Sequence, residues 1–123
     1  MDADADRPTT LRIDTGNGMT IAADHWPGER TPVVLAHGGG QTRHSWGGTA
    51  AEIAARGHRV VSIDLRGHGD SSWAPDGDYA MAAYRADAIA VAEHVGEPVV
   101  WVGASLGGMT GLHAVDAEPD RFS

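Results

Sequence analysis

The sequence predicts an α/β fold in which a parallel sheet carries an antiparallel hairpin at one edge. Short apolar runs at 33–36, 59–64 and 98–102 have the composition of strands that are buried on both faces. Segments with apolar residues at helical spacing separate these runs, and such alternation implies parallel strands joined by right-handed crossover helices. An Asn-Gly pair at 17–18 favours a tight hairpin turn, which predicts the antiparallel pair.

The N-terminal segment contains a leader, a hairpin and a loop, in that order. Residues 1–9 are expected to be a disordered leader, because acidic residues alternate with alanine there. Residues 11–14 and 19–23 are expected to pair around the turn at 15–18. Proline and glycine then predict a loop over 27–32, directly before the first buried strand.

Two helices are expected between the buried strands. The first spans 45–56, where apolar residues recur at helical spacing and Gly57 is placed to stop the helix. The segment 66–78 is rich in Gly, Ser, Pro and Asp and is expected to lack regular structure. The second helix spans 80–95 and ends at Gly96. Its apolar stripe is expected to contain Met81, Tyr84, Ala88, Val91 and Val95, and its polar side Arg85, Asp87 and Glu93.

The most informative stretch is the strand-to-helix turn Gly103-Ala104-Ser105-Leu106-Gly107. It is a G-x-S-x-G pattern in which a strand leads into a sharp turn and then into a helix-compatible segment. Such a turn holds the serine in a strained backbone conformation and lifts its hydroxyl clear of the sheet. Glycine flanks the serine because a side chain there would collide with the neighbouring strand or helix. Ser105 is therefore the candidate nucleophile, and the alternative is a glycine-rich turn with an incidental serine.

Two upstream segments accompany this turn in a fixed order. Residues 33–40 read VVLAHGGG, and residues 60–72 read VVSIDLRGHGDSS. Together the three segments resemble the α/β-hydrolase superfamily, and the resemblance covers residues 10–123. It implies that the glycine loop follows the third strand and forms part of an oxyanion hole. It also implies that the D-x-R-G-x-G-x-S segment follows the fourth strand and the serine turn the fifth.

The resemblance also implies roles for individual residues. Ser105 would be the nucleophile, and the backbone N–H of Leu106 would bind the oxyanion. The second donor would be the N–H of Gly39, with Gly40 as the alternative, unless the glycines only form a tight turn. Relatives that open epoxides or displace halide carry Asp at the nucleophile position. Serine therefore points to a small-molecule acyl substrate, that is, to hydrolysis of an ester, a lactone or a similar bond.

The acid and base that complete such a catalytic triad are not recognisable. In the family they follow the serine, in the order acid and then histidine. The candidates after Ser105 are His113, Asp116, Glu118 and Asp120. All lie in the helix after the turn or at its exit, and none ends a later strand. The sequence is therefore expected to be an N-terminal half of an α/β-hydrolase domain, with an incomplete domain over 10–123.

The polar residues near the glycine loop are expected to have structural roles. His37 opens the loop, and the resemblance implies that it orients the loop by hydrogen bonding rather than acting as a base. His68 belongs to a loop-fixing motif, in which Asp64 and Arg66 are expected to pair or to cap the backbone. Trp46 lies where a pocket wall would be, but a core position is the more common use of such a residue.

Composition argues against several other classes of function. The formal net charge of −8 disfavours nucleic acid or an anionic membrane as partner, since both attract basic patches. The sequence has no cysteine, no H-x-x-x-H or H-E-x-x-H pattern and no Gly-Lys-Ser/Thr, so neither a metal, a cofactor nor a phosphate site is expected. No apolar run approaches the ~20 residues that cross a bilayer, and no signal peptide is recognisable, so a cytoplasmic location is expected.

Three functional hypotheses follow from the sequence. The first is a serine hydrolase present without its triad acid and base. The second is a non-catalytic binding module that keeps the oxyanion loop and the serine turn, and the third is an inactive truncated gene product. The run at 98–102 is expected to be an exposed apolar edge strand. Through it the chain would form a homo-oligomer or pair with a missing C-terminal half.

Overall fold

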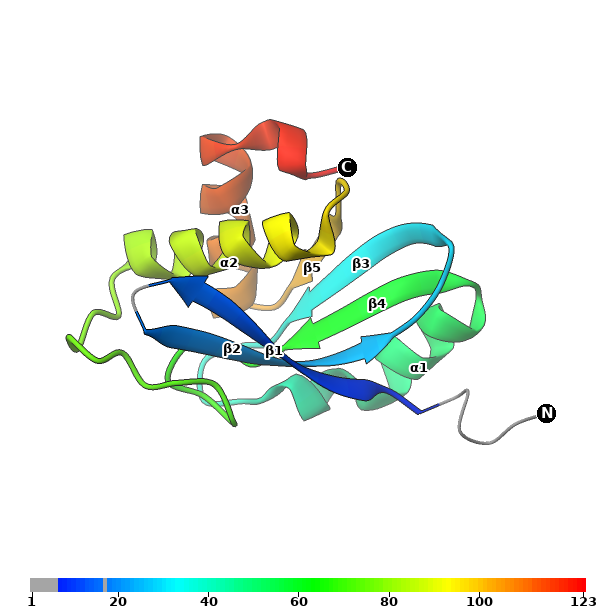
Figure 1. The fold of residues 1–123 in the computed structure, drawn as a ribbon, viewed down its shortest axis with the longest axis horizontal. Coiled ribbons are helices and arrows are strands. Elements are labelled where there is room, and N and C mark those ends of the chain that lie inside the picture. The colour runs from blue at the N-terminus through cyan, green and yellow to red at the C-terminus, as the bar shows by residue number, and fades with distance from the viewer. Residues whose placement is uncertain (1–6, 17) are drawn as a thin grey trace.

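The N-terminal hairpin and three parallel strands form one sheet. A computed structural model describes residues 7–16 and 18–123. In that part of the chain the sheet has five strands in the order β1-β2-β4-β3-β5, and helices lie on both of its sides (Figure 1). The strands are β1 Thr9–Gly16, β2 Met19–Trp26, β3 Arg30–Ala36, β4 His58–Ile63 and β5 Val100–Gly103. The helices are α1 Gly47–Ala55, α2 Met81–Val95 and α3 Leu106–Ala117, with short 3₁₀ helices at Arg43–Trp46 and Pro119–Arg121.

The pairing confirms the predicted mixture of strand directions. β1 pairs with β2, and β2 with β4, in antiparallel fashion. β3 lies between β4 and β5 and is parallel to both. The carboxyl ends of these three parallel strands therefore meet at one edge of the sheet. Each of the three motif segments continues from one of these strands into the loop or turn that follows it.

The hairpin begins earlier than the sequence predicted. β1 starts at Thr9, which pairs with His25, so the expected leader overlaps the strand. Threonine is β-branched and suits a strand, and β2 is long enough to supply it with a partner. Residues 1–6 of the expected leader and Asn17 of the expected turn lie outside the described residues.

Two further strand boundaries differ from the predicted ones. β3 begins at Arg30 rather than at 33, and Pro32 occupies a register shift where its missing N–H costs no ladder bond. β5 begins at Val100 rather than at 98, because the preceding Val99 forms an isolated parallel bridge with Phe122 instead. The expected exposed strand is wrong for Val99, which is fully buried.

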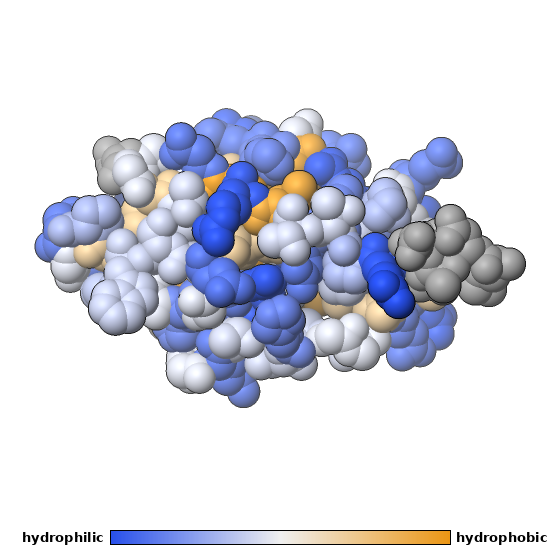
Figure 2. All heavy atoms as spheres, turned by 60° about the horizontal axis from the view of Figure 1, so that its bottom comes forward, coloured by the Kyte–Doolittle hydropathy of each residue, from blue (hydrophilic) through white to orange (hydrophobic). Residues whose placement is uncertain are grey.

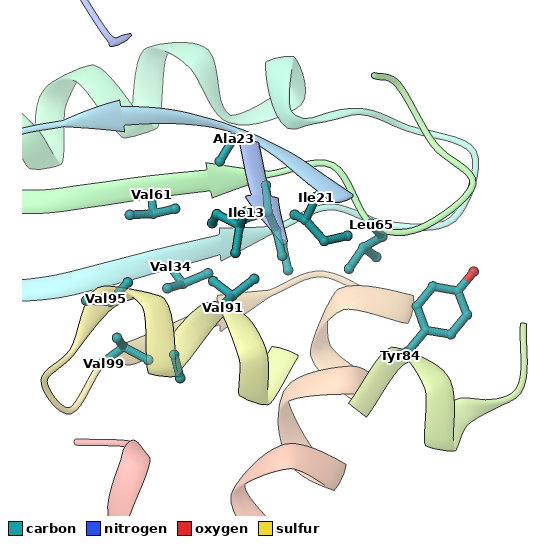
Figure 3. Packing of buried hydrophobic residues seen from close by; sticks show 13 residues of the cluster. Ile13, Ile21, Ala23, Val34, Val61, Leu65, Tyr84, Val91, Val95 and Val99 are labelled. Carbon is teal, nitrogen blue, oxygen red and sulfur yellow. The ribbon is translucent and has the colours of Figure 1, made fainter. Parts of the chain in front are cut away.

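Apolar side chains fill both sides of the sheet. The main cluster lies between the sheet and α2, where Val34 and Val61 face Val91 and Val95 (Figure 3). A second cluster lies on the α1 side and includes Leu35, against which Trp46 packs. Successive β3 residues thus point into different clusters, as expected for a strand that is buried on both faces. The location of Trp46 agrees with the core interpretation.

The helices correspond to the predicted ones, with one correction. α1 is preceded by a 3₁₀ turn and is followed by Gly57 at a φ of +97°, which confirms the expected stop.

In α2 the predicted stripe is buried at Tyr84, Ala88, Val91 and Val95. Asp87 was expected on the polar side, but it is buried. Its carboxylate accepts two hydrogen bonds from Arg66, of 2.6 and 2.8 Å, which satisfy the buried charge.

Apolar surface is unevenly distributed over the molecule. Figure 2 brings the lower side of Figure 1 forward, and hydrophilic residues dominate that face. By contrast, α3 exposes Leu112 (69%), Met109 (49%) and Val115 (39%) beside the edge strand β5. No helix among the residues that the structure describes has the length and apolar character needed to span a membrane.

Candidate active site

Ser105 has an unusual backbone conformation at the turn between β5 and α3. Its φ is 50° and its ψ is −112°. Within the described part of the chain it is the one residue other than glycine with a positive φ. Such a conformation costs ~1–3 kcal/mol and persists only where the surrounding structure enforces it. The side chain of Ser105 is exposed at the carboxyl edge of the sheet.

Close packing between α3 and the sheet enforces this turn. A Cβ on Gly107 would overlap the carbonyl oxygen of Ala36 at the end of β3. A Cβ on Gly103 would overlap the backbone of Gly107 itself. Because both positions lack a side chain, the Gly107 N–H approaches His37 closely and donates to its carbonyl oxygen at 3.1 Å. The collision that the sequence predicted at these two glycines is therefore confirmed.

The glycine loop, residues 37–42, lies against this turn. A Cβ on Gly38 would lie 3.7 Å from Cβ of Ser105, and one on Gly39 would lie 4.0 Å from Cδ2 of Leu106. Two of the three segments that the sequence singled out, the glycine loop and the serine turn, thus meet at Ser105. Gly39 and Leu106, the two predicted donors, belong to neighbouring backbone segments.

The backbone N–H groups of the loop differ in whether they are already bound. Gly38 donates to Oε1 of Gln41 at 3.1 Å, and Gly40 donates to Nε2 of His68 at 3.0 Å. Within residues 7–16 and 18–123, the N–H groups of Gly39 and Leu106 have no hydrogen-bond acceptor. These contacts favour Gly39 over Gly40 as the loop donor to a ligand.

His37 is buried and uses both ring nitrogens. Its Nδ1 lies 2.7 Å from the Gly38 carbonyl oxygen and donates to it, while Nε2 accepts the N–H of Leu65 at 3.0 Å. Burial lowers the pKa of His37, and nearby His68 lowers it further, against opposing effects of the Gly38 carbonyl and Asp64. A neutral ring with both nitrogens occupied orients the loop and is not free to take a proton from Ser105. This agrees with the structural role that the resemblance implied.

His68 holds the loop from the other side. Its Nδ1 lies 3.0 Å from the Arg66 carbonyl oxygen and donates to it, which leaves Nε2 to accept the Gly40 N–H. The rings of His37 and His68 lie 4.9 Å apart between centroids. The 64–70 segment after β4 therefore fixes the glycine loop through two histidines.

Asp64 and Arg66 do not pair with each other, contrary to one of the two expected arrangements. Arg66 binds Asp87, whereas the buried Asp64 binds the guanidinium of Arg43. Asp64 also caps the backbone, as the other arrangement predicted, because it accepts the N–H of Arg43 at 2.6 Å and that of Asp70 at 3.0 Å.

Arg43 lies directly after the glycine loop and is not among the residues that the sequence predicted for the site. Its guanidinium contacts Asp64 and lies 3.0 Å from carboxylate oxygens of both Asp24 and Asp70. Burial lowers the pKa of Arg43, but the interactions that its guanidinium makes with these acceptor carboxylates outweigh burial and raise the pKa overall. Arg43 is therefore a permanent cation. Two features of the sequence could have indicated this role. An arginine directly follows the glycine loop, and aspartates lie in or directly after strands elsewhere in the chain.

A hollow adjoins Ser105, but among the described residues its hydroxyl has no hydrogen-bonded base. Its Oγ forms no hydrogen bond with another described residue, and His113 and Asp116 are exposed on α3. A hollow of about 720 Å³ adjoins the serine and has a largely apolar lining. The lining side chains include Trp101, Met109, Leu112 and Val115. Because these belong to the edge strand and to α3, the hollow is an uncovered apolar face rather than an enclosed pocket. The described residues hold no group of three or more side chains suited to a metal ion.

Comparison with known proteins identifies relatives of this arrangement. A family model described as alpha/beta hydrolase fold matches residues 31–123. An esterase from Mycobacterium tuberculosis is 32% identical over 92% of this chain and 36% of the esterase. A non-heme haloperoxidase from Rhodococcus erythropolis is 36% identical over 78% of this chain and 35% of its own length. The chain thus spans about a third of the length of the curated relatives it matches.

Solved structures show the same architecture. A laboratory-evolved variant of potato epoxide hydrolase superimposes with a TM-score of 0.85 at 27% identity, over 94% of this chain and 38% of the hydrolase. An epoxide hydrolase from Vigna radiata superimposes with a TM-score of 0.80 at 22% identity, over 96% of this chain and 38% of its own.

Proposed function

Because the chain belongs to the alpha/beta hydrolase fold family, we propose that it carries the nucleophile and the oxyanion hole of a serine hydrolase. The substrate is a small molecule with an ester, lactone or similar acyl bond. The observation that carries this proposal is the positive φ of Ser105, at the edge where the glycine loop and α3 meet. Backbone strain of this kind is concentrated at functional sites.

The proposed chemistry is acyl transfer. Ser105 Oγ forms a bond to the acyl carbon and gives its proton to a base from outside the described residues, while the carbonyl oxygen becomes an oxyanion. The N–H groups of Gly39 and Leu106 bind that oxygen, and each such donor contributes ~3 kcal/mol at the transition state. Collapse of the tetrahedral intermediate breaks the bond to the leaving oxygen, which takes up that proton and departs as an alcohol, and water then hydrolyses the acyl-serine.

The nature of the nucleophile favours an acyl substrate over an epoxide. The matched structures include epoxide hydrolases, while the sequence relatives include an esterase, so the shared fold alone does not choose between them. Relatives that open epoxides are expected to use Asp at the position of Ser105. A serine that attacks an acyl carbon forms an ester, which water hydrolyses, whereas a serine that opened an epoxide would be left as an ether.

The proton acceptor for Ser105 is the missing part of this mechanism. Both nitrogens of His37 and of His68 are engaged with backbone groups. We therefore propose that the acid and base come from outside the described residues. The unpaired Ser105 hydroxyl also supports a second candidate function, a binding module for acyl compounds that performs no turnover.

Turnover of a small activated ester by the purified 123-residue chain tests the first proposal. Loss of triad members in serine hydrolases leaves only residual catalysis from the oxyanion hole and from binding. We expect turnover far below the ordinary enzyme value of ~10 per second. Turnover near that value, absent from Ser105→Ala, would mean that a base such as His37 or one from a second chain is in use.

Covalent labelling separates a hydrolase site from a binding module. We expect a fluorophosphonate to modify Ser105 slowly but in preference to the exposed Ser45, because only Ser105 has oxyanion donors beside it. Mass spectrometry of the labelled peptides measures the two rates. Equal rates at Ser105 and Ser45 would contradict the hydrolase proposal and favour the binding module.

A further inference from the structure

Three contacts fix the glycine loop to the 64–70 segment. At its start, His37 Nε2 accepts the N–H of Leu65 at 3.0 Å. In its middle, the Gly40 N–H donates to His68 Nε2 at 3.0 Å. After its end, the Arg43 N–H donates to Asp64 Oδ1 at 2.6 Å. The N–H of Gly39 lies between the first two contacts and has no acceptor of its own within the described chain. Its direction is therefore set by its neighbours.

The 64–70 segment is in turn closed by the Arg43 side chain. The guanidinium Nη1 contacts Asp64 at one end of the segment and lies 3.0 Å from Asp70 Oδ2 at the other end. Asp64 also accepts the Asp70 N–H at 3.0 Å, so the two ends are tied together directly as well. His68, which holds Gly40, lies inside this closed segment.

The same guanidinium is anchored to the sheet. Its Nε lies 3.0 Å from Asp24 Oδ1 in β2. The Arg43 carbonyl oxygen accepts a hydrogen bond of 2.9 Å from the Ser62 hydroxyl in β4. Asp64 is fully buried and Asp24 and Arg43 nearly so. Removal of the guanidinium would leave the buried carboxylates of Asp24 and Asp64 without their shared arginine, which strongly disfavours the closed arrangement.

We propose that Arg43 is a positioning residue for the oxyanion hole. It closes the 64–70 segment so that His68 holds Gly40, and this directs the neighbouring Gly39 N–H toward the oxygen that Leu106 also binds. The inference rests on the proposed function for the identity of the ligand, but its structural part does not need catalysis. Lysine would keep the charge but not the planar fork that reaches several carboxylates at once, so it can replace Arg43 only in part.

Hydrogen exchange of the 123-residue chain, at low concentration and with single-residue resolution by mass spectrometry, tests the structural part. We expect Arg43→Met to speed exchange of the Gly40 N–H about tenfold, because its bond to His68 is weakened. Arg43→Lys should give a smaller increase. The control Arg56→Ala removes an exposed arginine whose side chain pairs with Glu52, and it should leave the exchange rate of the Gly40 N–H unchanged. Unchanged exchange within β4 and α2 shows that the fold is retained.

Ser62→Ala covers the case in which Arg43→Met does not fold. It removes only the bond to the Arg43 carbonyl and alters no charge, and it should also speed exchange at Gly40. Unaltered exchange at Gly40 in Arg43→Lys and Ser62→Ala, or in a folded Arg43→Met, would overturn the proposal.

The rate of fluorophosphonate labelling separates this inference from the proposed function. If Gly40 exchange rises and labelling of Ser105 slows severalfold in the Arg43 variants, both stand. If exchange rises while labelling is unchanged, Arg43 orders the loop but the proposed positioning of an oxyanion donor is wrong. If Ser105 of the original chain shows no preference over Ser45, the proposed function fails, while the exchange result still decides whether Arg43 orders the loop.

Discussion

Ser105 combines a strained backbone conformation with an exposed side chain. Its positive φ lifts the hydroxyl out of the sheet edge. The turn is held by the Met109 N–H, which donates to the Ser105 carbonyl at 2.9 Å, and by the contact of Gly107 with His37. The serine thus stays in a conformation that glycine adopts at no steric cost.

Ser105→Gly is expected to raise the free energy of unfolding by about 1 kcal/mol, because it releases this strain. The greater freedom of glycine in the unfolded chain offsets part of the gain. Ser105→Ala keeps the Cβ and is expected to stay within about 0.5 kcal/mol of the original chain. Urea unfolding at one fixed protein concentration compares the three. Equal stability of the glycine and alanine variants would show that the turn is unstrained.

His37 should make stability depend on pH. Its pKa is lowered in the folded chain, chiefly by burial, so the unfolded chain takes up a proton first as the pH falls. The contribution of His37 is therefore fully present above its ordinary pKa of 6.5 and is lost as the pH falls from there through the folded value. His25 acts in the same direction, because burial and then Arg59 and His94 lower its pKa as well.

The midpoint of urea unfolding, determined at a series of pH values between about 8 and 5, measures this dependence of stability on pH. We expect His37→Gln to flatten the acid side of the profile, whereas the exposed His113→Gln should keep its slope. A profile of His37→Gln as steep as that of the original chain would assign the acid sensitivity to other groups.

At the scale of elements, the junction between β3 and α3 determines whether the site forms. α3 begins directly against the end of β3, with Gly107 in contact with Ala36. Gly107→Ala should therefore destabilise the fold by about 2–4 kcal/mol, because the new Cβ forces backbone apart. Gly47, at the start of α1, has open space around it and no positive φ. Gly47→Ala is the matched control and should be neutral or slightly stabilising. Similar unfolding midpoints for both variants would contradict the tight junction.

The elements predicted from sequence are those with local signals. The turn at Ser105 and the end of α1 before Gly57 depend on residues a few positions apart, so both could be predicted from the sequence. The bonds of Arg43 to Asp64 and of Arg66 to Asp87 each join residues 21 positions apart. No periodicity encodes such pairs, because the partner depends on which loops the sheet brings together. Asp87 consequently appeared to be a surface residue.

At the scale of the whole molecule, one face is mostly hydrophilic, whereas the edge formed by β5 and α3 exposes apolar side chains. In the part of the chain that the structure describes, β5 is the last strand of the sheet. Val99, directly before β5, forms the bridge with Phe122 through backbone hydrogen bonds to Arg121 and Ser123. Beyond this bridge, the apolar residues of α3 border the hollow beside Ser105. Unpaired edge groups next to apolar surface favour the addition of another strand.

We therefore expect the 123-residue chain to self-associate through β5 and α3 as its concentration rises. Size-exclusion chromatography with light scattering across a wide concentration range measures this. Val100→Lys places a charge on the edge strand, and Leu112→Lys places one on the apolar face, so each should shift the chain toward monomer. Trp73→Gln is the control, since Trp73 is 78% exposed but does not line the hollow. If the original chain remained a monodisperse monomer at every concentration, the edge would be protected in some other way. If Trp73→Gln alone restored the monomer, association would proceed through the loop between β4 and α2 instead.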